Sequence, residues 1–480
     1  MVIVLPKIFP VACHTDNVGL GTVFVAICGQ KYDGLLYIPQ AVAKGASCVV
    51  VQNDAVISDD MLSLLRTHGV SLVRVENARK SLAELSAKAA GYPAEKLKII
   101  GITGSKGKTT SVYVLEALLK RLGKKVARLS TVANAIDGQE FHAVLTTGQP
   151  DYLHQFFAVC VAQGVEYVAM EVAAQATTFN RIDDIAFDGL IFTNLEREHA
   201  ELYPTMEEYF AAKCAIIDKL KPGAMCVVNG DDLYGQQVLG LYPSKTQSFT
   251  LDDMSELQDQ SQTVTRVKHD NNQVVFTSAN ATFTLPISGL VGEFNVRNLA
   301  GAVMVLVANG CDSTVLSNDI FTIPKVPGRL EEYALSNGAR AYIDYAHTPA
   351  SFESLLSVMR GLTDDLIVVF GAGGNKDTIK RPLMGKVAYK YADFVVITND
   401  NPRQEDPEKI VRDIIAGIEN PEKSKVVVEL DRTKAIEIAY NYSKKGSIIM
   451  LLGKGVDEYQ IVGLEKSFFS EKQVLQSLNN

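Results

Sequence analysis

The chain has 480 residues, of which 47% are hydrophobic and 21% are charged, and its formal net charge is −8. This acidic balance argues against nucleic acid or an anionic membrane surface as the main partner. At about 100 to 200 residues per domain, the length predicts three domains, each able to bury its own core. Seven cysteines without a C-x-x-C pair predict reduced core thiols, and a short N-terminus broken by prolines predicts no signal peptide, so we expect a cytoplasmic protein.

The first segment, residues 1–96, alternates short apolar stretches with helical patterns. We predict strands at 22–27, 48–51 and 71–75 and helices at 38–44 and 78–90. This pattern indicates a small α/β domain. Its polar loop at 29–34 (GQKYDG) follows a strand, so it is either a simple turn or a ligand contact.

A glycine-rich turn at the start of the second segment indicates phosphate binding. The sequence LKIIGITGSKGKTT at 97–110 predicts a buried strand, a loop and then a helix. Glycines let backbone N–H groups converge on an anion at the helix N-terminus, a lysine reaches the terminal phosphates, and a threonine hydroxyl ligates Mg²⁺. The residues expected to hold a nucleoside triphosphate are Gly104, Ser105, Lys106, Gly107, Lys108, Thr109 and Thr110. The spacing is shorter than the standard G-x-x-x-x-G-K-[ST], and a simple glycine turn before a helix is the alternative.

The second segment, residues 97–326, continues in a strand-then-helix rhythm that predicts a parallel sheet covered on both faces. We predict its further strands at 125–129, 166–170, 187–193 and 224–228. Ligands bind at the carboxyl ends of such strands, where Glu171, Asn194 and His199 stand. Glu171 suits Mg²⁺ beside a phosphate loop, and the alternative is a cap of the next helix. His199 is either a residue of the same site or a packed histidine.

The third segment, residues 327–480, again alternates strands with helices. We predict its strands at 341–343, 366–370, 394–398, 426–429 and 447–452. The turn GAGGNK at 371–376 resembles the start of a dinucleotide fingerprint, but Lys376 replaces the third glycine and no acidic residue ends a strand about 20 residues further on. We therefore expect no NAD site there. We also expect a surface loop at 252–263.

Nine motifs, in the right order along nearly the whole chain, together resemble the Mur ligase family, and most closely its MurE type. They are GITGSKGKTT (101–110), Glu171, FTNLEREH (192–199), YFAAK (209–213), GEFNVRN (292–298), VPGRLE (326–331), IDYAHTP (343–349), DNPRQEDP (400–407) and GKGVDEYQ (453–460). The resemblance implies an α/β chain of three domains. These would be a UDP-sugar-binding domain at 1–96, an ATPase domain with a central P-loop-type parallel sheet at 97–326, and a Rossmann-like amino-acid-binding domain at 327–480.

The resemblance implies a cytoplasmic, monomeric enzyme of peptidoglycan precursor synthesis. Its substrates would be ATP, UDP-N-acetylmuramoyl-L-alanyl-D-glutamate (UDP-MurNAc-dipeptide) and a diamino acid, either meso-diaminopimelate or L-lysine. ATP would phosphorylate the D-Glu carboxylate, and the amine of the diamino acid would then attack the acyl phosphate. Lys108 and Mg²⁺ would offset the charge that accumulates on the phosphates.

The resemblance also assigns roles to individual residues. The catalytic set would be Lys108, Glu171, His199 and Lys213, and the metal side would comprise Thr109, Glu171, His199 and Lys213. Lys213 would be carbamylated by CO₂, which gives an anionic ligand. Beyond the phosphate loop, the nucleotide would be held by Asn295, Asn298, Arg329 and Asp344. The substrate-side residues would be Thr15, Thr146, Thr147 and Arg181 for the sugar-peptide, and Lys376, Asp400, Asn401, Arg403, Gly453 and Asp457 for the amino acid.

Several residues differ from the family's pattern. These differences fall on the sugar-peptide and amino-acid sides, whereas the residues on the ATP side match the family. The tripeptide His-Thr-Asp at 14–16 stands for the family's Asp-Ser-Arg, and alanines at 173–174 replace two serines. Lys376 and Asp457 replace the arginine and glutamate of members that add diaminopimelate. Two alternatives therefore stay open, namely a paralogue that joins a different carboxylate and amine, and a non-enzymatic ATP-binding protein.

Overall fold

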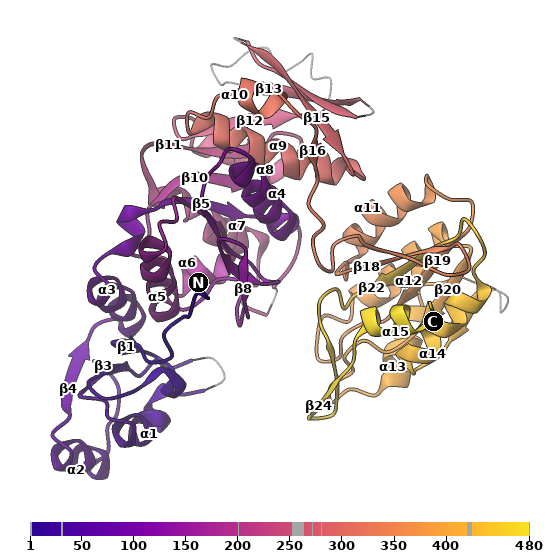
Figure 1. Cartoon of the computed structure of the whole chain (residues 1–480). Coiled ribbons are helices and arrows are strands. Elements are labelled where there is room, and N and C mark those ends of the chain that lie inside the picture. Colours follow the sequence, from indigo (N-terminus) through magenta and orange to yellow (C-terminus); the bar gives the residue numbers. More distant parts are fainter. Residues whose placement is uncertain are drawn as a thin grey trace. The chain divides into compact units, whose positions relative to one another are not determined.

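The computed structural model describes residues 2–29, 32–199, 201–251, 264–270, 272–279, 281–419 and 425–479 (Figure 1). The surface loop expected at 252–263, and positions 30–31 of the polar loop at 29–34, lie outside the described residues. Contacts divide the chain into two compact units. The first unit is Met1–Leu290 with Asn295–Pro324, and the second unit is Val291–Phe294 with Lys325–Asn480. None of the described helices is long and apolar enough to cross a membrane.

The N-terminal part of the first unit contains a parallel sheet whose described strands have the order β1-β2-β3-β4. They are β1 (Val11–Ala12), β2 (Val23–Val25), β3 (Cys48–Gln52) and β4 (Ser71–Val75). The helices α1 (Ile38–Ala43) and α2 (Asp59–Thr67) pack on one face of this sheet and α3 (Ala78–Ala89) on the other. The predicted strands and helices of this segment are confirmed. The structure adds β1, which is too short to show a periodic pattern.

The remainder of the first unit is built on a second sheet, which has twelve strands in the part of the chain that the structure describes. From one edge to the other these are β16 (Phe321–Thr322), β15 (Thr282–Ser288), β14 (Gln273–Thr277), β13 (Val264–Asp270), β12 (Thr246–Thr250), β11 (Leu220–Asn229), β10 (Phe187–Phe192), β5 (Lys98–Thr103), β9 (Tyr167–Glu171), β6 (Val126–Leu129), β7 (Asn134–Ile136) and β8 (Gln139–Phe141). The strands from β12 to β6 are parallel, as predicted. The antiparallel runs β13-β14-β15 and β6-β7-β8 were not predicted, because their strands follow one another within a few residues of sequence and a strand-then-helix rhythm does not mark them.

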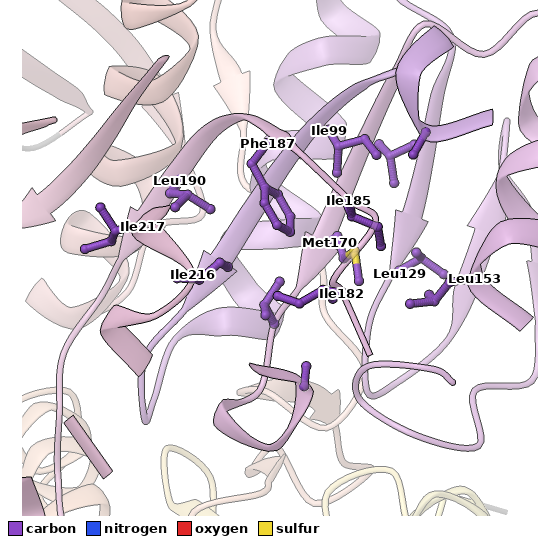
Figure 2. Packing of buried hydrophobic residues seen from close by; sticks show 14 of the residues in the cluster. Ile99, Leu129, Leu153, Met170, Ile182, Ile185, Phe187, Leu190, Ile216 and Ile217 are labelled. Atoms are coloured by element: carbon purple, nitrogen blue, oxygen red, sulfur yellow. The ribbon is translucent and has the colours of Figure 1, made fainter. Parts of the chain in front are cut away.

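Helices cover both faces of the parallel strands. They are α4 (Lys108–Arg121), α5 (Pro150–Ala162), α6 (Ala174–Thr178), α7 (Met206–Cys214), α8 (Leu233–Leu241), α9 (Glu293–Ala308) and α10 (Ser313–Ser317). On one face, Leu153 of α5 packs with Met170 and Phe187 of the strands (Figure 2). On the other, Leu115 of α4 and Leu299 of α9 belong to a separate cluster. Because both faces are closed by apolar side chains, the carboxyl edge of the strands is left for polar ligands.

The second unit is a doubly wound α/β domain, as the Rossmann-like prediction requires. The order of its main sheet, for the residues described, is β17 (Glu331–Ala334), β18 (Arg340–Asp344), β22 (Ile448–Leu452), β19 (Leu366–Phe370), β20 (Phe394–Ile397) and β21 (Val426–Val428). Among the described strands of this sheet, only β17 is antiparallel to its neighbour. The strands β23 (Tyr459–Val462) and β24 (Glu465–Phe468) form a separate hairpin. The helices α11 (Pro349–Arg360), α12 (Lys380–Tyr391) and α13 (Pro407–Ile415) pack on one face, and α14 (Arg432–Tyr442) and α15 (Glu471–Ser477) on the other.

Candidate active site

The turn between β5 and α4 forms the loop for which phosphate binding is predicted, and its geometry requires the glycines. Gly104 has φ +142° and Gly107 has φ +83°, both in the left-handed region. A Cβ on Gly104 would stand 1.9 Å from Thr193 Oγ1, and one on Gly107 would stand 2.2 Å from Asn298 Oδ1. The loop is therefore closed tightly against the residues that follow β10 and against α9.

The carboxyl end of β10 holds the loop in place. The backbone N–H of Ser105 donates to Asn194 O, and that of Lys106 donates to Asn194 Oδ1, each at 2.9 Å. Thr193 Oγ1 donates to Lys106 O at 2.6 Å, and the Lys106 amine forms an ion pair with Glu198. The loop after one strand is thus fixed by the end of the neighbouring strand, which is the edge where a parallel sheet binds its ligands.

The side chain of Lys108, the first residue of α4, folds back onto the loop that precedes it. Its Nζ donates to Gly104 O at 2.8 Å and to Ser105 O at 2.9 Å. Thr109 is buried and Thr110 is half-buried on the first turn of α4. A lysine amine and a threonine hydroxyl at the N-terminus of a helix are the groups that hold the terminal phosphates and the Mg²⁺ of a bound nucleotide.

Lys213, on α7, reaches the same loop from the other side. Its side chain is 2% exposed, and its Nζ donates to Gly104 O at 2.7 Å. The amine also lies over the ring of Tyr209, 4.7 Å from the ring centroid. Burial, and then the charge of Lys108, lower the pKa of Lys213 well below its usual range. The surroundings therefore shift this amine towards its neutral form.

His199 stands beside the same tyrosine. Its ring contacts the ring of Tyr209 edge-to-face, with centroids 6.0 Å apart, and its Nδ1 lies 3.4 Å from Glu201 Oε1. The backbone of His199 is left-handed, with φ +56°, which is uncommon for a residue with a side chain. Burial lowers the pKa of this imidazole, although Glu198 and Glu201 oppose the effect. Tyr209 therefore brings His199 and Lys213 to one side of the loop.

Glu171 ends β9 next to the phosphate-loop strand, and its side chain is buried. Its Oε1 accepts from the backbone N–H of Thr131 at 2.9 Å, and its Oε2 lies 3.1 Å from Thr131 Oγ1. The following helix, α6, begins after Ala173 without any side-chain cap. The alternative that Glu171 caps this helix is therefore wrong. Thr131 was not predicted, because it stands 40 residues away in the sequence.

The donors on the metal side fit a magnesium ion that is bound together with phosphates. Within the described ranges, no group of three or more His, Cys, Asp or Glu side chains forms a ready-made cage. Mg²⁺ does not need one, because it commonly takes one or two carboxylates, substrate phosphates and water. Glu171 supplies a carboxylate at the strand end, and Thr109 supplies a hydroxyl on the phosphate loop.

The nucleotide-side residues are divided between the two units. In the first unit, Asn298 Nδ2 donates to Asn295 Oδ1 at 3.2 Å, so both predicted residues of α9 lie together beside the phosphate loop. In the second unit, Asp344 accepts from the backbone N–H of Leu330 at 2.8 Å. The guanidinium of Arg329 lies over the ring of Tyr345. Their predicted approach to the nucleotide remains a prediction.

On the sugar-peptide side, three of the predicted residues are connected. Thr147 is 1% exposed, its hydroxyl donates to Glu171 O at 3.0 Å, and its carbonyl accepts from Arg181 Nη1 at 3.0 Å. Thr146 Oγ1 accepts from Thr131 Oγ1 at 3.0 Å, next to the same glutamate. The residues predicted to bind the sugar-peptide therefore lie next to Glu171, one of the residues predicted to bind the metal.

Thr15 is buried in the N-terminal part, and its backbone is held by a lysine. Lys44 Nζ donates to Thr15 O at 2.8 Å and lies 3.5 Å from Asp16 Oδ1. The side chain of Asp16 is 76% exposed, so this ion pair contributes little to stability. Asp16, which stands where the family has an arginine, thus faces solvent beside Lys44, the residue that caps the C-terminus of α1.

On the amino-acid side, the side chains of two basic residues approach one glycine. A Cβ on Gly373 would stand 3.1 Å from Arg403 Nη1 and 3.7 Å from Lys376 Cγ. Arg403 Nη1 also donates to Gly374 O at 2.9 Å. A planar, forked guanidinium is a group that binds a carboxylate through two parallel hydrogen bonds, and a lysine ammonium adds a point charge.

Acidic groups stand on the neighbouring strand end. A Cβ on Gly453 would lie 3.6 Å from Asp400 Oδ2, and the fully buried Lys454 lies 3.5 Å from Asp400 Oδ1. Asn401 Oδ1 accepts from the backbone N–H of Ile461 at 3.0 Å. Burial, and the charge of Asp400, raise the pKa of Asp457. The structure therefore gathers the predicted amino-acid residues at one edge of the second unit's sheet.

A buried ion cluster that was not predicted fixes the two loops of this edge. Arg381 is 0% exposed, and both of its terminal nitrogens lie 2.7 Å from the carboxylate oxygens of Glu405. It also donates to Asp413 at 2.8 Å, while Glu405 accepts from the backbone N–H of Asn375 at 3.1 Å. The hydrogen bonds from Arg381 lower the pKa of Glu405 to about 2. This cluster ties the loop of Lys376 to the loop of Arg403.

Models of three protein families match successive stretches of the chain. The model of the Mur ligase family catalytic domain matches residues 11–90, that of the Mur ligase middle domain matches 102–306, and that of the Mur ligase glutamate ligase domain matches 328–455.

Curated relatives match the chain nearly from end to end. A UDP-N-acetylmuramoyl-L-alanyl-D-glutamate–2,6-diaminopimelate ligase from Trichormus variabilis is 35% identical over 467 residues, which cover 95% of this chain and 90% of the relative. An enzyme of the same name from Aquifex aeolicus is 32% identical over 99% of this chain and 94% of its own length.

Solved structures share the fold. The structure of a UDP-N-acetylmuramoyl-L-alanyl-D-glutamate–2,6-diaminopimelate ligase is 24% identical with a TM-score of 0.64, over 98% of this chain and 94% of that one. A MurF ligase from Thermotoga maritima in complex with ADP is 20% identical with a TM-score of 0.60, over 92% and 93%. The predicted three-domain architecture is thereby confirmed.

Proposed function

Because this chain belongs to the Mur ligase family, we propose that it joins meso-diaminopimelate to the D-Glu carboxylate of UDP-MurNAc-dipeptide in a reaction driven by ATP. The proposal depends most on the convergence of Lys108 and Lys213 on Gly104 O at the phosphate loop. A protein that only bound ATP would not need a second, fully buried lysine there. The relatives that share the chain from end to end are ligases, so the non-enzymatic alternative is set aside.

The chemistry follows from the poor reactivity of a carboxylate. Transfer of the γ-phosphoryl group from ATP to a carboxylate oxygen releases ADP and gives an acyl phosphate with a good leaving group. The amine nitrogen then attacks the carbonyl carbon, the tetrahedral intermediate collapses, the bond to the phosphate oxygen breaks and the amine loses a proton. The products are an amide and inorganic phosphate.

The residues of the phosphate loop would stabilise the charge that moves during this transfer. Lys108 would contact the terminal phosphates, and the loop amides would face the phosphate oxygens. Thr109, Glu171 and His199 would hold Mg²⁺, which supplies positive charge between the phosphates when it is bound. Asn295 and Asn298 would lie against the base of the nucleotide.

We propose that Lys213 is carbamylated. The neutral amine attacks the carbon of CO₂, loses a proton to water and becomes a carbamate with a full negative charge. Full burial and the neighbouring Lys108 favour the neutral amine that this step requires. The carbamate would supply a further oxygen ligand for metal, which an ammonium group does not.

The cations around Gly373 favour diaminopimelate over L-lysine. Lys376 and Arg403 would bind the distal carboxylate of diaminopimelate, whereas the side-chain ammonium of L-lysine would be repelled there. The carboxylates of Asp400 and Asp457 would face the ammonium groups of the same molecule.

An end-point assay with separate amino acids tests the proposal. The purified protein is incubated with ATP, Mg²⁺, bicarbonate and UDP-MurNAc-dipeptide, together with meso-diaminopimelate, L-lysine or L-ornithine, and phosphate release and product mass are measured. We expect diaminopimelate to give equal amounts of phosphate and a UDP-MurNAc-tripeptide. Turnover with L-lysine alone would show that L-lysine is the amino acid added, and no turnover with any of the three would refute the proposal.

The exposed Asp16 supports a second candidate, a paralogue that joins a different carboxylate and amine. An acidic group in place of a cation on the UDP-sugar side would weaken the binding of a diphosphate. Binding of UDP-MurNAc, measured by calorimetry, separates the two candidates, because the paralogue should not bind it. We also propose that the enzyme acts as a monomer in the cytoplasm, and light scattering of the purified protein tests the oligomeric state.

A further inference from the structure

Two arginines from distant parts of the first unit meet on one phenylalanine. Arg79 is the second residue of α3, and Arg181 comes two residues after Phe179, which ends α6. Their guanidinium carbons lie 4.8 Å (Arg79) and 5.7 Å (Arg181) from the centroid of the Phe179 ring. Both arginine side chains are half-buried. The ring therefore holds two cations close together. This place lies beside α3, which packs against β1 of the N-terminal sheet and against α5, which covers the second sheet (Figure 1).

Neither guanidinium forms an ion pair with a carboxylate of the described residues. Arg79 Nη2 donates to Cys28 O at 3.1 Å, and Arg181 Nη1 donates to Thr147 O at 3.0 Å. Arg181 Nε is buried and has no hydrogen-bond partner within the described ranges. Burial lowers the pKa of both arginines, and the charge of Arg79 lowers that of Arg181 further. Two cations held together without a counterion are unfavourable, which indicates a site built for an anion.

The acidic groups beside the pair do not supply that anion. Cys13 lies near Arg181, but burial raises the pKa of its thiol well above the usual range, so the thiol is uncharged at neutral pH. Asp151 accepts from the backbone N–H groups of Cys13 and Tyr152 at 2.9 Å each. The counterion of the pair must therefore come from a ligand.

The partners of the two arginines locate the site. Thr147, which Arg181 contacts, donates its hydroxyl to Glu171 O at the carboxyl end of β9. Cys28, which Arg79 contacts, follows β2 at the carboxyl edge of the N-terminal sheet. A ligand that touches both arginines therefore lies between the ligand-binding edges of both sheets of the first unit.

We propose that Arg79 shares one anion-binding subsite with Arg181, which the resemblance already assigns to the sugar-peptide, and that Arg79 is an additional specificity-determining residue for the UDP-sugar peptide. This inference rests on the proposed function. UDP-MurNAc-dipeptide offers two kinds of oxyanion, the diphosphate and the peptide carboxylates, and forked guanidinium donors suit both. The pair would couple recognition by the N-terminal domain to the placement of the reacting carboxylate near Glu171.

The first test measures the KM of each substrate separately. Arg79→Gln should raise the KM for UDP-MurNAc-dipeptide by about 10- to 100-fold, the loss expected for one charged hydrogen bond, and should leave the KM for ATP and for the amino acid unchanged. Arg79→Lys, which keeps the charge and loses the fork, should raise it less. Arg66→Gln, an exposed arginine at the end of α2, is the matched control and should behave as wild type. An unchanged KM in a folded Arg79→Gln variant would overturn the inference.

A double variant tests whether the two arginines share one anion. If they do, Arg79→Gln combined with Arg181→Gln should raise the KM for the sugar-peptide by less than the product of the two single effects. Independent effects that multiply would overturn the shared site. Thermal melting of every variant identifies those that unfold. If Arg79→Gln unfolds, the KM of folded Arg79→Lys for UDP-MurNAc-dipeptide is compared with that of wild type, and an unchanged KM would overturn the role of Arg79.

Inhibition by UDP-MurNAc, which lacks the peptide, identifies the oxyanion. An inhibition constant that rises in Arg79→Gln assigns the pair to the diphosphate, and an unchanged constant together with a raised KM assigns it to a peptide carboxylate. Wild-type protein that neither binds nor turns over UDP-MurNAc-dipeptide would refute the proposed function and this inference together. Normal wild-type turnover with an insensitive Arg79 would refute the inference alone.

Discussion

Lys108 Nζ and Lys213 Nζ donate to the same acceptor, the carbonyl oxygen of Gly104, at 2.8 and 2.7 Å. Two ammonium groups on one carbonyl repel each other, so one of the amines is favoured in its neutral form. Lys213 is the one whose pKa is lowered well below its usual range. A carbamate on Lys213 would replace this repulsion by an attraction to Lys108. The pair therefore links the chemical state of Lys213 to the phosphate-binding role proposed for Lys108.

Lys213→Ala should abolish ligation in a way that bicarbonate does not reverse. The variant lacks the amine that takes up CO₂, but a short carboxylic acid such as acetate or formate should enter the space and partly restore turnover. Phosphate release is measured with and without each acid. Lys245→Ala, an exposed lysine in an ion pair with Asp218, is the control and should retain full activity. An active Lys213→Ala variant without any added acid would remove the carbamate from the mechanism.

Lys108→Ala should lower kcat for ATP-dependent ligation by at least about 100-fold, because it removes a fixed positive charge from the transferred phosphoryl group. The fold should remain intact, since the amine donates to carbonyl oxygens of the loop beside its own helix N-terminus and is not part of an apolar core cluster. Single-turnover phosphate release gives the rate, and circular dichroism checks the fold. Lys124→Ala serves as the control on an exposed site. Near-normal turnover of Lys108→Ala would contradict the phosphate role.

Local spacing made much of this molecule predictable. The strand, glycine turn and helix around Gly104 and Lys108 were predictable because their pattern lies in consecutive residues, and phosphate binding at this loop stays a prediction. The parallel strands were found because strands buried on both faces are continuous apolar runs, such as the fully buried Leu366–Phe370. Elements with a strong local pattern are those that a single sequence reveals.

Contacts between distant residues were not predictable in the same way. Thr131 contacts the Glu171 carboxylate, and Arg381 contacts Glu405, only because segments at the ends of neighbouring strands come together in the fold. No residue spacing encodes such a meeting. The antiparallel strand Val264–Asp270 was missed for a related reason, since its pairing with Gln273–Thr277 depends on the register of the two strands.

Gly104→Ala should prevent nucleotide binding. The new Cβ would stand 1.9 Å from Thr193 Oγ1, and the backbone would be strained at φ +142°, so the loop must move. We expect a loss of at least about 10-fold in the affinity for a non-hydrolysable ATP analogue, measured by calorimetry. Gly240→Ala is the control, because a Cβ there meets nothing within 4 Å, and it should bind the analogue normally. Equal binding by both variants would show that the loop does not contact the phosphates.

Glu405→Gln should destabilise the second unit and change its response to acid. Removing one partner of a buried ion pair costs about 3 kcal/mol, measured as the free energy of unfolding in denaturant. The folded-state pKa of Glu405 is about 2, below its usual value of 4.5, so its contribution is complete above pH 4.5 and is lost as the pH falls toward 2. The free energy of unfolding of Glu405→Gln should therefore lack the decrease that Glu405 causes in wild type between pH 4.5 and pH 2. Glu408→Gln, at an exposed ion pair, should change stability by less than about 0.5 kcal/mol, and equal losses in the two variants would contradict the prediction.

Arg403→Met should raise the KM for meso-diaminopimelate by about 10- to 100-fold, because it removes the forked donor from the proposed carboxylate site beside Gly373. Lys376→Glu should make ligation of L-lysine faster than ligation of meso-diaminopimelate. The new carboxylate would repel the distal carboxylate of diaminopimelate and attract the ammonium of L-lysine. Ligation rates with the two amino acids are measured at equal concentrations. Lys386→Met, on the exposed face of α12, should leave both rates unchanged. If Arg403→Met and Lys376→Glu keep the wild-type ratio of the two rates, the cations around Gly373 do not select the amino acid.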